Sequence, residues 1–291
     1  MSFDFSNKSK FNSQIIKNIF VDIADMIKQN VAKLHKTIED DSNDFGEKYD
    51  FSGLMDIVER TNTEECLLSK SNKNTYYYGI GNVGVCYNGS PEVFLYMVLK
   101  AIKTNNNIVF FECEEPHATN AILLDLVKNV CEKNDYKICI ETVTVRDNAE
   151  LAEVSSELDM FIFINEQQRY LDFCARNSAT VKIKCSNYGT MDLFLDDKQL
   201  ENRLIEMDEY VYNRNIDLEI YKNDSVENVV KRINLRKNNF CAVIFTNNSK
   251  DAYYFIENVD AEKVFVNRNP QNSYFYEIDD RELTLKKSIF Y

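Results

Sequence analysis

The rhythm of hydrophobic positions changes once along the chain, near residue 76. Before it, apolar residues recur at three- and four-residue spacing, which predicts an amphipathic helix over residues 11–38. A polar run at 40–46 is expected to break this helix, and a second helix is predicted over 51–61. Residues 62–74 are polar and predict a connector. The N-terminal part of the chain is therefore expected to be helical.

After residue 76, short apolar runs alternate with amphipathic stretches. The runs are continuously apolar, which is typical of parallel strands covered by helices on both faces. The predicted strands are 83–87, 108–111, 138–145, 160–164, 180–183, 193–195, 218–221, 242–245, 264–266 and 283–290, and the predicted helices are 91–103, 117–132, 148–157, 166–175, 198–210, 225–235 and 250–258. This order predicts an α/β fold built on a Rossmann-like parallel sheet.

The same pattern divides the chain into four expected parts. They are an N-terminal helical region at 1–75, a Rossmann-like domain at 76–196, a second, reduced α/β domain at 197–268, and a C-terminal strand tail at 269–291. Neither internal repeats nor low-complexity segments interrupt this order.

The net charge of the chain argues against two classes of binding partner. The chain carries 47 acidic and 34 basic side chains, a net charge of −13. Such a chain repels phosphate backbones and anionic lipid, so neither a nucleic acid nor a membrane surface is expected as a partner. No apolar run reaches the ~20 residues that span a bilayer, and the N-terminus lacks the basic and apolar segments of a signal peptide. A cytoplasmic protein is therefore expected.

Cysteine and histidine form no metal-binding motif. Eight cysteines lie between positions 66 and 241, and none forms a CxxC pair, which argues against a zinc ribbon. The two histidines, His35 and His117, are far apart in sequence, which argues against a histidine-rich metal centre. Several cysteines stand in apolar runs, as buried thiols in a reducing compartment do. No metal site is predicted.

Four stretches of the chain, in order, resemble the aldehyde dehydrogenase superfamily, and most of all its γ-glutamyl phosphate reductase branch. They are a strand and turn at 81–91, a helix end and strand at 99–111 with the next helix at 119–122, a stretch at 179–196, and closing strands at 264–267 and 282–287. The resemblance covers residues 76–291. It implies a coenzyme domain of Rossmann type, a thiolate nucleophile, and NADP or NAD as the hydride carrier.

The nucleophile that the resemblance implies has no counterpart in this chain. In the reductase branch it lies in a loop after the strand that ends here at Asp196, and residues 197–216 contain no cysteine. Cys185 is the one weak candidate, because Lys182 and Lys184 are near in sequence and a nearby ammonium lowers a thiol pKa. Along a strand, however, Lys184 points to the face opposite Cys185. A structural thiol is the other interpretation, and no catalytic residue is assigned.

The cofactor site that the resemblance implies is also altered. After Phe111 the family has a basic residue and glycines, whereas this chain has Glu112, Cys113, Glu114 and Glu115. Carboxylates there repel phosphate, so no bound cofactor is expected. The run 112–115 is interpreted either as a solvated loop or as a site for a cation or a basic partner. His117 is correspondingly interpreted as a metal ligand or as a solvated or capping residue.

Three functions remain open on these grounds. The first is a catalytically silent aldehyde dehydrogenase-like protein that serves for assembly or partner binding. The second is a divergent oxidoreductase that uses NADP or NAD on an aldehyde or acyl phosphate, and the third is a small-ligand-binding protein. For the first, an unpaired terminal strand is expected to self-associate or to bind a protein partner through Leu283, Leu285, Ile289 and Phe290.

Overall fold

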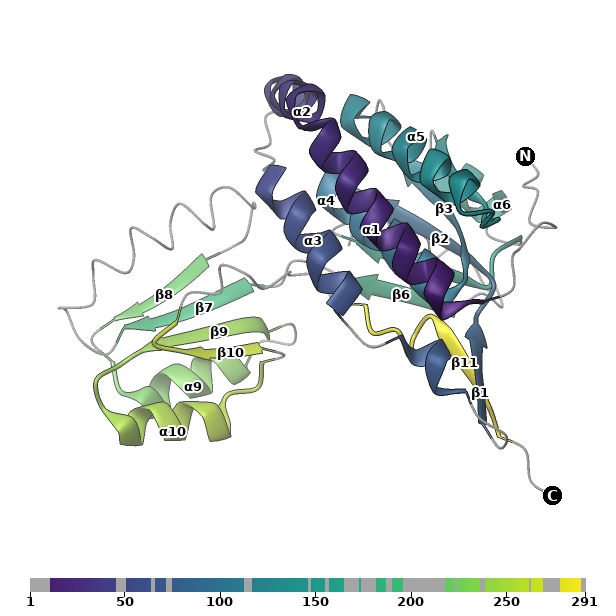
Figure 1. Cartoon of the computed structure of the whole chain (residues 1–291). Helices are drawn as coiled ribbons and strands as arrows, with labels where there is room; N and C mark the ends of the chain where they lie inside the picture. Colours follow the sequence, from purple (N-terminus) through teal and green to yellow (C-terminus); the bar gives the residue numbers. More distant parts are fainter. Residues whose placement is uncertain are drawn as a thin grey trace. The chain divides into compact units, whose positions relative to one another are not determined.

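Figure 1 shows the computed structural model of the chain. The structure describes residues 11–45, 51–63, 66–71, 75–112, 117–145, 148–154, 157–164, 173, 182–186, 190–195, 218–222, 224–235, 239–261, 263–268 and 278–288. Among them, no helix is both long enough and apolar enough to cross a membrane. The predicted helix at 198–210 lies outside the described residues, as does the one at 166–175 apart from Phe173.

The chain forms two compact units, and one is inserted into the other. Unit 1 comprises residues 1–187 together with 276–291, and unit 2 comprises 188–275. The boundaries expected from the sequence cut across these units. The N-terminal helices and the C-terminal strand tail both belong to unit 1, and the strand at 190–195 belongs to unit 2.

Unit 1 begins with three helices, α1 (Ser13–Gln29), α2 (Val31–Phe45) and α3 (Phe51–Thr63). The prediction of one helix over 11–38 is wrong, because the chain breaks at Asn30, whose amide Nδ2 donates to the Met26 carbonyl. The predicted break at 40–46 is also wrong, since α2 continues through this acidic stretch to Phe45. Helices α1 and α2 pack against α5, and α3 packs against α4.

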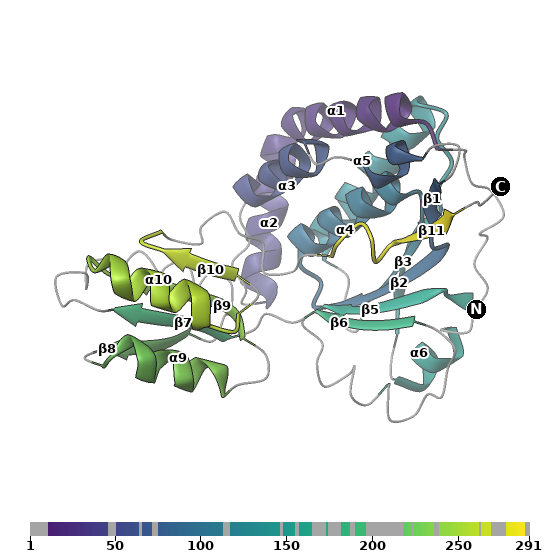
Figure 2. The same cartoon turned by 90° about the horizontal axis from the view of Figure 1, so that it is seen from below.

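The core of unit 1 is a five-stranded parallel sheet, as the sequence predicts. Its order is β4-β3-β2-β5-β6, formed by β2 (Asn82–Tyr87), β3 (Asn107–Glu112), β4 (Ile140–Thr144), β5 (Met160–Ile164) and β6 (Lys182–Ser186). Helices α4 (Pro91–Thr104) and α5 (Ala118–Lys133) cover one face, and α6 (Asn148–Val154) lies on the other (Figure 2). Helices therefore lie on both faces of this sheet.

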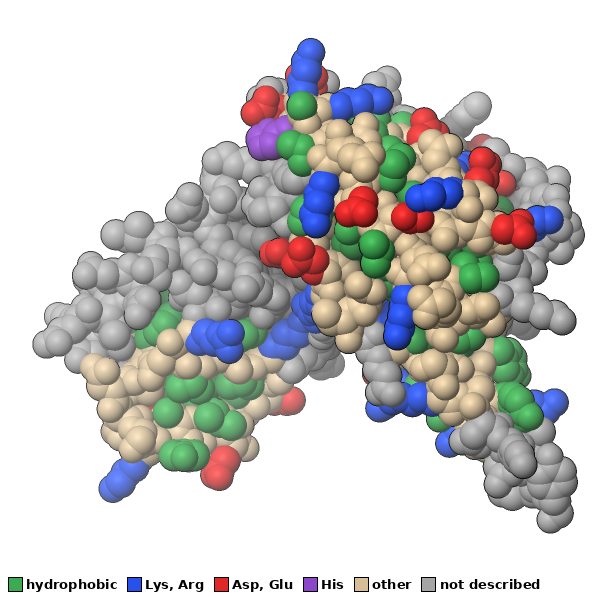
Figure 3. All heavy atoms as spheres, in the orientation of Figure 1, with side chains coloured by type: hydrophobic (Ala, Val, Ile, Leu, Met, Phe, Trp, Pro, Cys, Tyr) green, Lys and Arg blue, Asp and Glu red, His purple; other side chains and the backbone are tan. Residues whose placement is uncertain are grey.

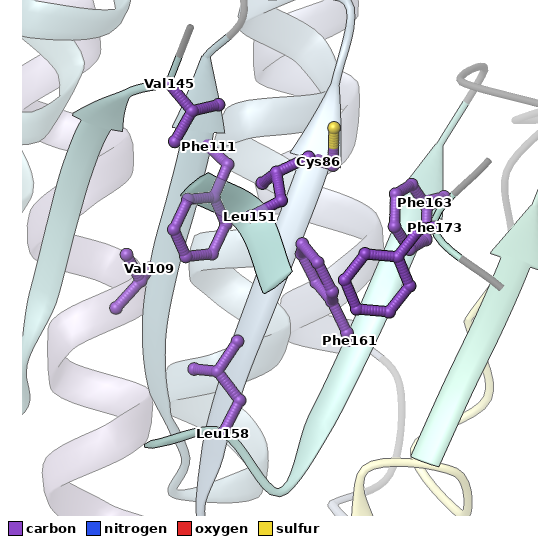
Figure 4. Close-up of a cluster of buried hydrophobic side chains, with 9 residues drawn as sticks. All are labelled: Cys86, Val109, Phe111, Val145, Leu151, Leu158, Phe161, Phe163 and Phe173. Carbon is purple, nitrogen blue, oxygen red and sulfur yellow. The ribbon is translucent and has the colours of Figure 1, made fainter. Parts of the chain in front are cut away.

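The face that carries α6 holds an aromatic cluster (Figure 4). The ring centroid of Phe161 lies 5.3 Å from that of Phe111, 4.6 Å from Phe163 and 5.1 Å from Phe173. Gly84 lies beneath these rings, and a Cβ at this position would overlap Leu158. A glycine is therefore required here by close packing rather than by a turn.

The C-terminal segment of unit 1 is anchored to α4 by buried polar contacts. Lys100 Nζ lies 2.9 Å from Asp280 Oδ1, and Lys103 Nζ lies 3.2 Å from Asp280 Oδ2. The Tyr96 hydroxyl bonds to both backbone groups of Ile278. These side chains are almost completely buried, so they tie the end of the chain to the helix that covers the sheet.

After this anchor, β11 (Thr284–Ser288) pairs antiparallel with β1 (Thr75–Gly79), next to the short 3₁₀ helix η1 (Leu67–Lys70). The prediction of an unpaired terminal strand is therefore wrong for the edge that faces β1. Leu283 is buried, with 1% exposed, whereas Leu285 is 42% exposed. Ile289 and Phe290 lie outside the described residues.

Unit 2 is a smaller parallel sheet with helices on one face. Its order is β10-β9-β7-β8, formed by β7 (Thr190–Leu195), β8 (Leu218–Lys222), β9 (Asn239–Phe245) and β10 (Lys263–Val266). Helices α9 (Val226–Asn234) and α10 (Ser249–Asn258) cover a core that includes Phe194, Ile244 and Phe255. Ser225 caps α9 by accepting a hydrogen bond from the Asn228 N–H.

Candidate functional site

An open α/β sheet binds its ligands at the carboxyl ends of its strands, near the point where the strand order reverses, and in this sheet the order reverses at β2, next to β3. The strands end side by side, and Tyr87 at the end of β2 is the register partner of Glu112 at the end of β3. Tyr87 belongs to a stretch that resembles the coenzyme domain of the family, whereas Glu112 opens the run in which the chain departs from it. The chemistry of these strand ends therefore decides what the fold can bind.

Glu112 is buried rather than solvated. Only 4% of the residue is exposed, and its Oε1 accepts a hydrogen bond of 2.7 Å from the Tyr87 hydroxyl. Burial raises the pKa of this carboxyl, since desolvation disfavours the charged form. The interpretation of 112–115 as a solvated loop is therefore wrong for Glu112. Cys113, Glu114 and Glu115 lie outside the described residues.

An amide from α5 completes this network. Asn120 Nδ2 donates to the Tyr87 hydroxyl at 2.9 Å and to the Gly89 carbonyl at 2.7 Å. Asn120 Oδ1 and Thr119 Oγ1 are also buried, and neither makes a hydrogen bond to any described residue. The Asn120 amide thus joins helix α5 to the turn after β2, in the space beyond the strand ends.

The N-terminus of α5 is capped by a carboxylate from a distant helix. Asp41 of α2 accepts hydrogen bonds from the N–H groups of Ala118, at 3.1 Å, and of Thr119, at 2.9 Å. A helix N-terminus with unbonded N–H groups is a ready site for phosphate. Here the Asp41 side chain already takes two of those N–H groups, which leaves this helix end poorly suited to bind an anion.

His117 packs over the turn that follows β2. It occupies the position just before α5, where its side chain makes no capping hydrogen bond, and it is only 4% exposed. Gly89 has a φ of 86°, and a Cβ there would overlap the imidazole ring. The prediction of a solvated or capping His117 is therefore wrong. Among the described residues, no group of three potential ligands could hold a metal ion.

Cys185 lies within β6, in register with Phe163 of β5. The strand runs to Ser186, beyond the predicted end at residue 183, so Lys184 and Cys185 are successive residues of one strand. The weak candidacy of Cys185 as a nucleophile therefore stays a prediction from the sequence.

The other described cysteines are buried or half-buried thiols, and none forms a disulfide with another described cysteine. Burial raises the pKa of Cys131 and of Cys241 to about 12. At pH 7 only about one molecule in 10⁵ would carry such a thiolate, which is the form that attacks a carbonyl. Burial also raises the pKa of Cys66. These thiols are therefore structural.

A second buried carboxylate, which sequence reasoning missed, lies in unit 2. Asp192 of β7 is fully buried and accepts a hydrogen bond of 3.1 Å from the Tyr221 hydroxyl of β8. The same hydroxyl lies 3.4 Å from Glu219 Oε2. The sequence feature that could have revealed this carboxylate is an aspartate inside an otherwise apolar strand. The bond joins neighbouring strands and serves the packing of this sheet.

Comparison with known proteins shows which proteins share this fold. No family model matches the chain. A γ-glutamyl phosphate reductase of Actinobacillus succinogenes is 25% identical over 132 residues, which are 44% of this chain and 31% of that protein. The chain thus covers less than a third of the length of this curated relative.

Solved structures match over nearly the whole chain. The γ-glutamyl phosphate reductase of Thermotoga maritima has a TM-score of 0.63 at 13% identity, covering 96% of this chain and 94% of that one. An acetylating aldehyde dehydrogenase of Geobacillus thermoglucosidasius has a TM-score of 0.74 at 9% identity, covering 97% and 92%. The expected fold class and the resemblance are confirmed: the chain has the fold of the aldehyde dehydrogenase superfamily.

Proposed function

We propose that the chain is a catalytically silent protein of aldehyde dehydrogenase fold that serves for assembly or partner binding. The observation that carries this proposal is the closed network at the strand ends. Tyr87 bonds there to Glu112 and to Asn120, and Glu112 opens the run 112–115, where the family resemblance calls for a basic residue and glycines. A buried carboxyl at this position opposes a pyrophosphate instead of binding it.

The sequence supports the same conclusion, because the nucleophile of the reaction is missing as well. Residues 197–216 contain no cysteine where the family resemblance calls for the nucleophile loop. The described thiols with pKa values near 12 are poor substitutes. The reducing cytoplasm is the compartment that fits this set of thiols.

Assembly is assigned to the C-terminal strand region. Leu285 exposes 42% of its surface beside Tyr78, which exposes 46%. Leu283 contributes only indirectly, because it is buried and holds the segment in place. Ile289 and Phe290 add further apolar residues in the sequence, after the interruption at 286–288. A strand pair of this kind needs further burial to be stable, and a second chain can supply it.

Titration with NADPH tests the first half of this proposal. Each charge-assisted hydrogen bond lost from a phosphate cradle removes about 1.5–3 kcal/mol, so calorimetry is expected to find no saturable binding below the millimolar range. Micromolar affinity would overturn the proposal. Hydride transfer to NADP that disappears in Cys185→Ala would support the divergent oxidoreductase instead.

Light scattering on the intact chain tests the second half. The expected result is an oligomer that Leu285→Asp converts to a folded monomer. Ile256→Asp on α10, where the side chain is 49% exposed, is the matched control and should leave the mass unchanged. Truncation is a poor test, because removing residues 282–291 would also remove buried Leu283. A chain that stays monomeric at 100 µM and captures no partner contradicts the assembly role.

A further inference from the structure

Helix α5 begins without a cap from its own first residues. His117 occupies the position before it and makes no capping hydrogen bond, and no acidic residue stands in the first turn. The first N–H groups of a helix carry a partial positive charge and need acceptors. The acceptor that the structure describes comes from α2, which lies beside the beginning of α5 (Figure 1). The positive end of α5 is thus capped by a different segment of the chain.

Asp41 of α2 binds this helix end as a small anion would. One carboxylate oxygen accepts from the Ala118 N–H at 3.1 Å, and the other accepts from the Thr119 N–H at 2.9 Å. Successive N–H groups at a helix N-terminus hold phosphate and carboxylate groups in the same manner. Only 4% of Asp41 is exposed, so its carboxylate is enclosed at this place.

A further buried polar group lies beside this carboxylate. The Thr119 hydroxyl is buried and makes no hydrogen bond to any described residue. It is attached through Cβ to the same Cα as the Thr119 N–H, so it lies close to one of the two N–H groups that Asp41 uses. A hydroxyl can donate one hydrogen bond, and a phosphate has more oxygens to accept it than a carboxylate has. The site therefore has a donor that Asp41 leaves unused.

The end of α2 that supplies Asp41 has an unfavourable distribution of charge. After Ile38 the sequence of α2 includes four carboxylates, at 39, 40, 41 and 44, and its last turn has no basic residue. The macrodipole is negative at a helix C-terminus, so carboxylates there destabilise the helix. Glu39 and Asp40 are exposed, and Figure 3 shows acidic side chains on the surface over α2. Of the described side chains after Ile38, Asp41 is the buried one, so its bonds to α5 hold this turn.

We propose that Asp41 is a built-in competitor for a small oxyanion at the N-terminus of α5, and that the last turn of α2 is a strap which such an anion releases. A phosphate that takes the N–H groups of Ala118 and Thr119 also gains the Thr119 hydroxyl. It lets the acidic turn of α2 unwind, which relieves the repulsion between its carboxylates and the negative end of that helix. The strap is independent of the assembly role proposed above.

Removing the competitor gives the first test. Because Asp41 is tethered and has an effective concentration of at least millimolar order, about 0.1 M phosphate is used, with NaCl of equal ionic strength as the reference. The thermal midpoint of Asp41→Ala should be about 2–4 °C higher in phosphate, since an anion that binds only the folded state stabilises it. Asp41→Asn keeps one acceptor for these N–H groups. It should show a smaller rise and serves the same comparison if Asp41→Ala does not fold.

Two matched variants control for charge and for the loss of a contact. Asp40→Ala removes an exposed neighbour of the same charge. Asp22→Ala removes the carboxylate that bonds to Lys133 and Asn134 at the other end of α5. Neither variant frees the N–H groups of a helix N-terminus, so neither should gain more from phosphate than the wild type does. Phosphate also stabilises folded proteins in general, and an equal rise in all variants would overturn the proposed site.

Hydrogen exchange on the wild type tests the strap itself. Peptides from the last turn of α2 should exchange severalfold faster in phosphate than in NaCl, whereas peptides from α1 should not change. Faster exchange in both helices would mean general loosening and would count against a local strap. A specific rise in the Asp41→Ala midpoint without faster exchange in the wild type would show that Asp41 is a permanent cap, which no free anion displaces.

Discussion

Two regions of unit 1 differ in which of their side chains are buried and which are exposed. At the carboxyl ends of β2 and β3, polar side chains are buried and bond to one another, with Glu112 only 4% exposed. On the strand pair β1–β11, which we call the arm, Tyr76 and Tyr78 are exposed, the latter at 46%, and so are Lys286 and Lys287. The first region is where an open α/β sheet normally meets a ligand. The second is a narrow strand pair that a monomeric protein would be expected to cover.

The difference teaches where interactions with other molecules can still occur. Buried polar groups that are hydrogen-bonded to one another gain little free energy from binding a ligand. They also resist rearrangement. Exposed apolar groups gain free energy from any partner that covers them. The strand ends are thus part of the core, whereas the arm has exposed apolar side chains that a partner could cover.

The largest expected effect comes from breaking the anchor of the arm. Asp280→Ala leaves Lys100 and Lys103, whose side chains are 5% and 2% exposed, without their shared carboxylate. Removing one partner of a buried ion pair costs about 3–5 kcal/mol of unfolding free energy. Urea denaturation should show this loss. Lys133→Ala breaks the surface pair with Asp22 and should cost less than about 1 kcal/mol, so equal losses in both variants would count against a buried anchor.

A smaller effect is expected at the strand ends. Tyr87→Phe removes the hydroxyl that donates to Glu112 and accepts from Asn120. A buried group left without its hydrogen bond costs about 1–3 kcal/mol, and chemical denaturation measures it. Tyr78→Phe makes the same substitution on the exposed arm and should change stability by less than about 0.5 kcal/mol. If the two variants behave alike, the contrast between the regions fails.

Glu112 should also make stability depend on pH in an unusual direction. Its pKa in the folded protein is raised above the ordinary value, so its contribution is complete below about 4.3 and is lost as pH rises through the folded pKa. Glu112→Gln stays neutral and should gain stability relative to wild type from pH 5 to pH 8, by about 1.4 kcal/mol for each unit of raised pKa. Glu59→Gln, at an exposed position of α3, is the matched control for the change in charge. Parallel pH curves for wild type and Glu112→Gln would argue for a solvated carboxylate.

The smallest effect on stability is expected on the arm itself. Leu285→Ser removes a cross-strand contact with Tyr78 and should cost at most about 1 kcal/mol, because such pairs contribute little. Thermal unfolding at low protein concentration measures this in the monomer. A loss above 3 kcal/mol would mean that Leu285 is buried within the chain and unable to serve an interface.

Most elements of the fold follow from the sequence, because apolar runs and polar breaks mark them directly. The strand Met160–Ile164 matches its predicted bounds, since five apolar residues stand between polar neighbours. The acidic end of α2 was missed because aspartate and asparagine disfavour a helix interior. A tertiary contact stabilises this end of α2, because Asp41 caps a helix that begins 77 residues later. Local propensity contains no trace of such a contact.

The candidate site was harder to predict for a related reason. Glu112 belongs to an acidic run, and acidic runs are usually solvated. Its burial depends on the register that sets it beside Tyr87, and on Asn120 from the next helix. Register follows from the pairing of strands 25 residues apart, so the sequence pattern predicts the strands without predicting which of their ends meet.

The anchor between Lys100 and Asp280 also sets an order of events during synthesis. The two residues are 180 positions apart, and all of unit 2 is translated between them. At roughly 5–20 residues per second, a ribosome needs about 10–40 s to cross that interval. During this time the lysines of α4 lack their carboxylate and β1 lacks β11. Unit 1 therefore stays unfinished until unit 2 has been translated, and β11 and Asp280 then complete a sheet and an anchor whose other halves were made before it.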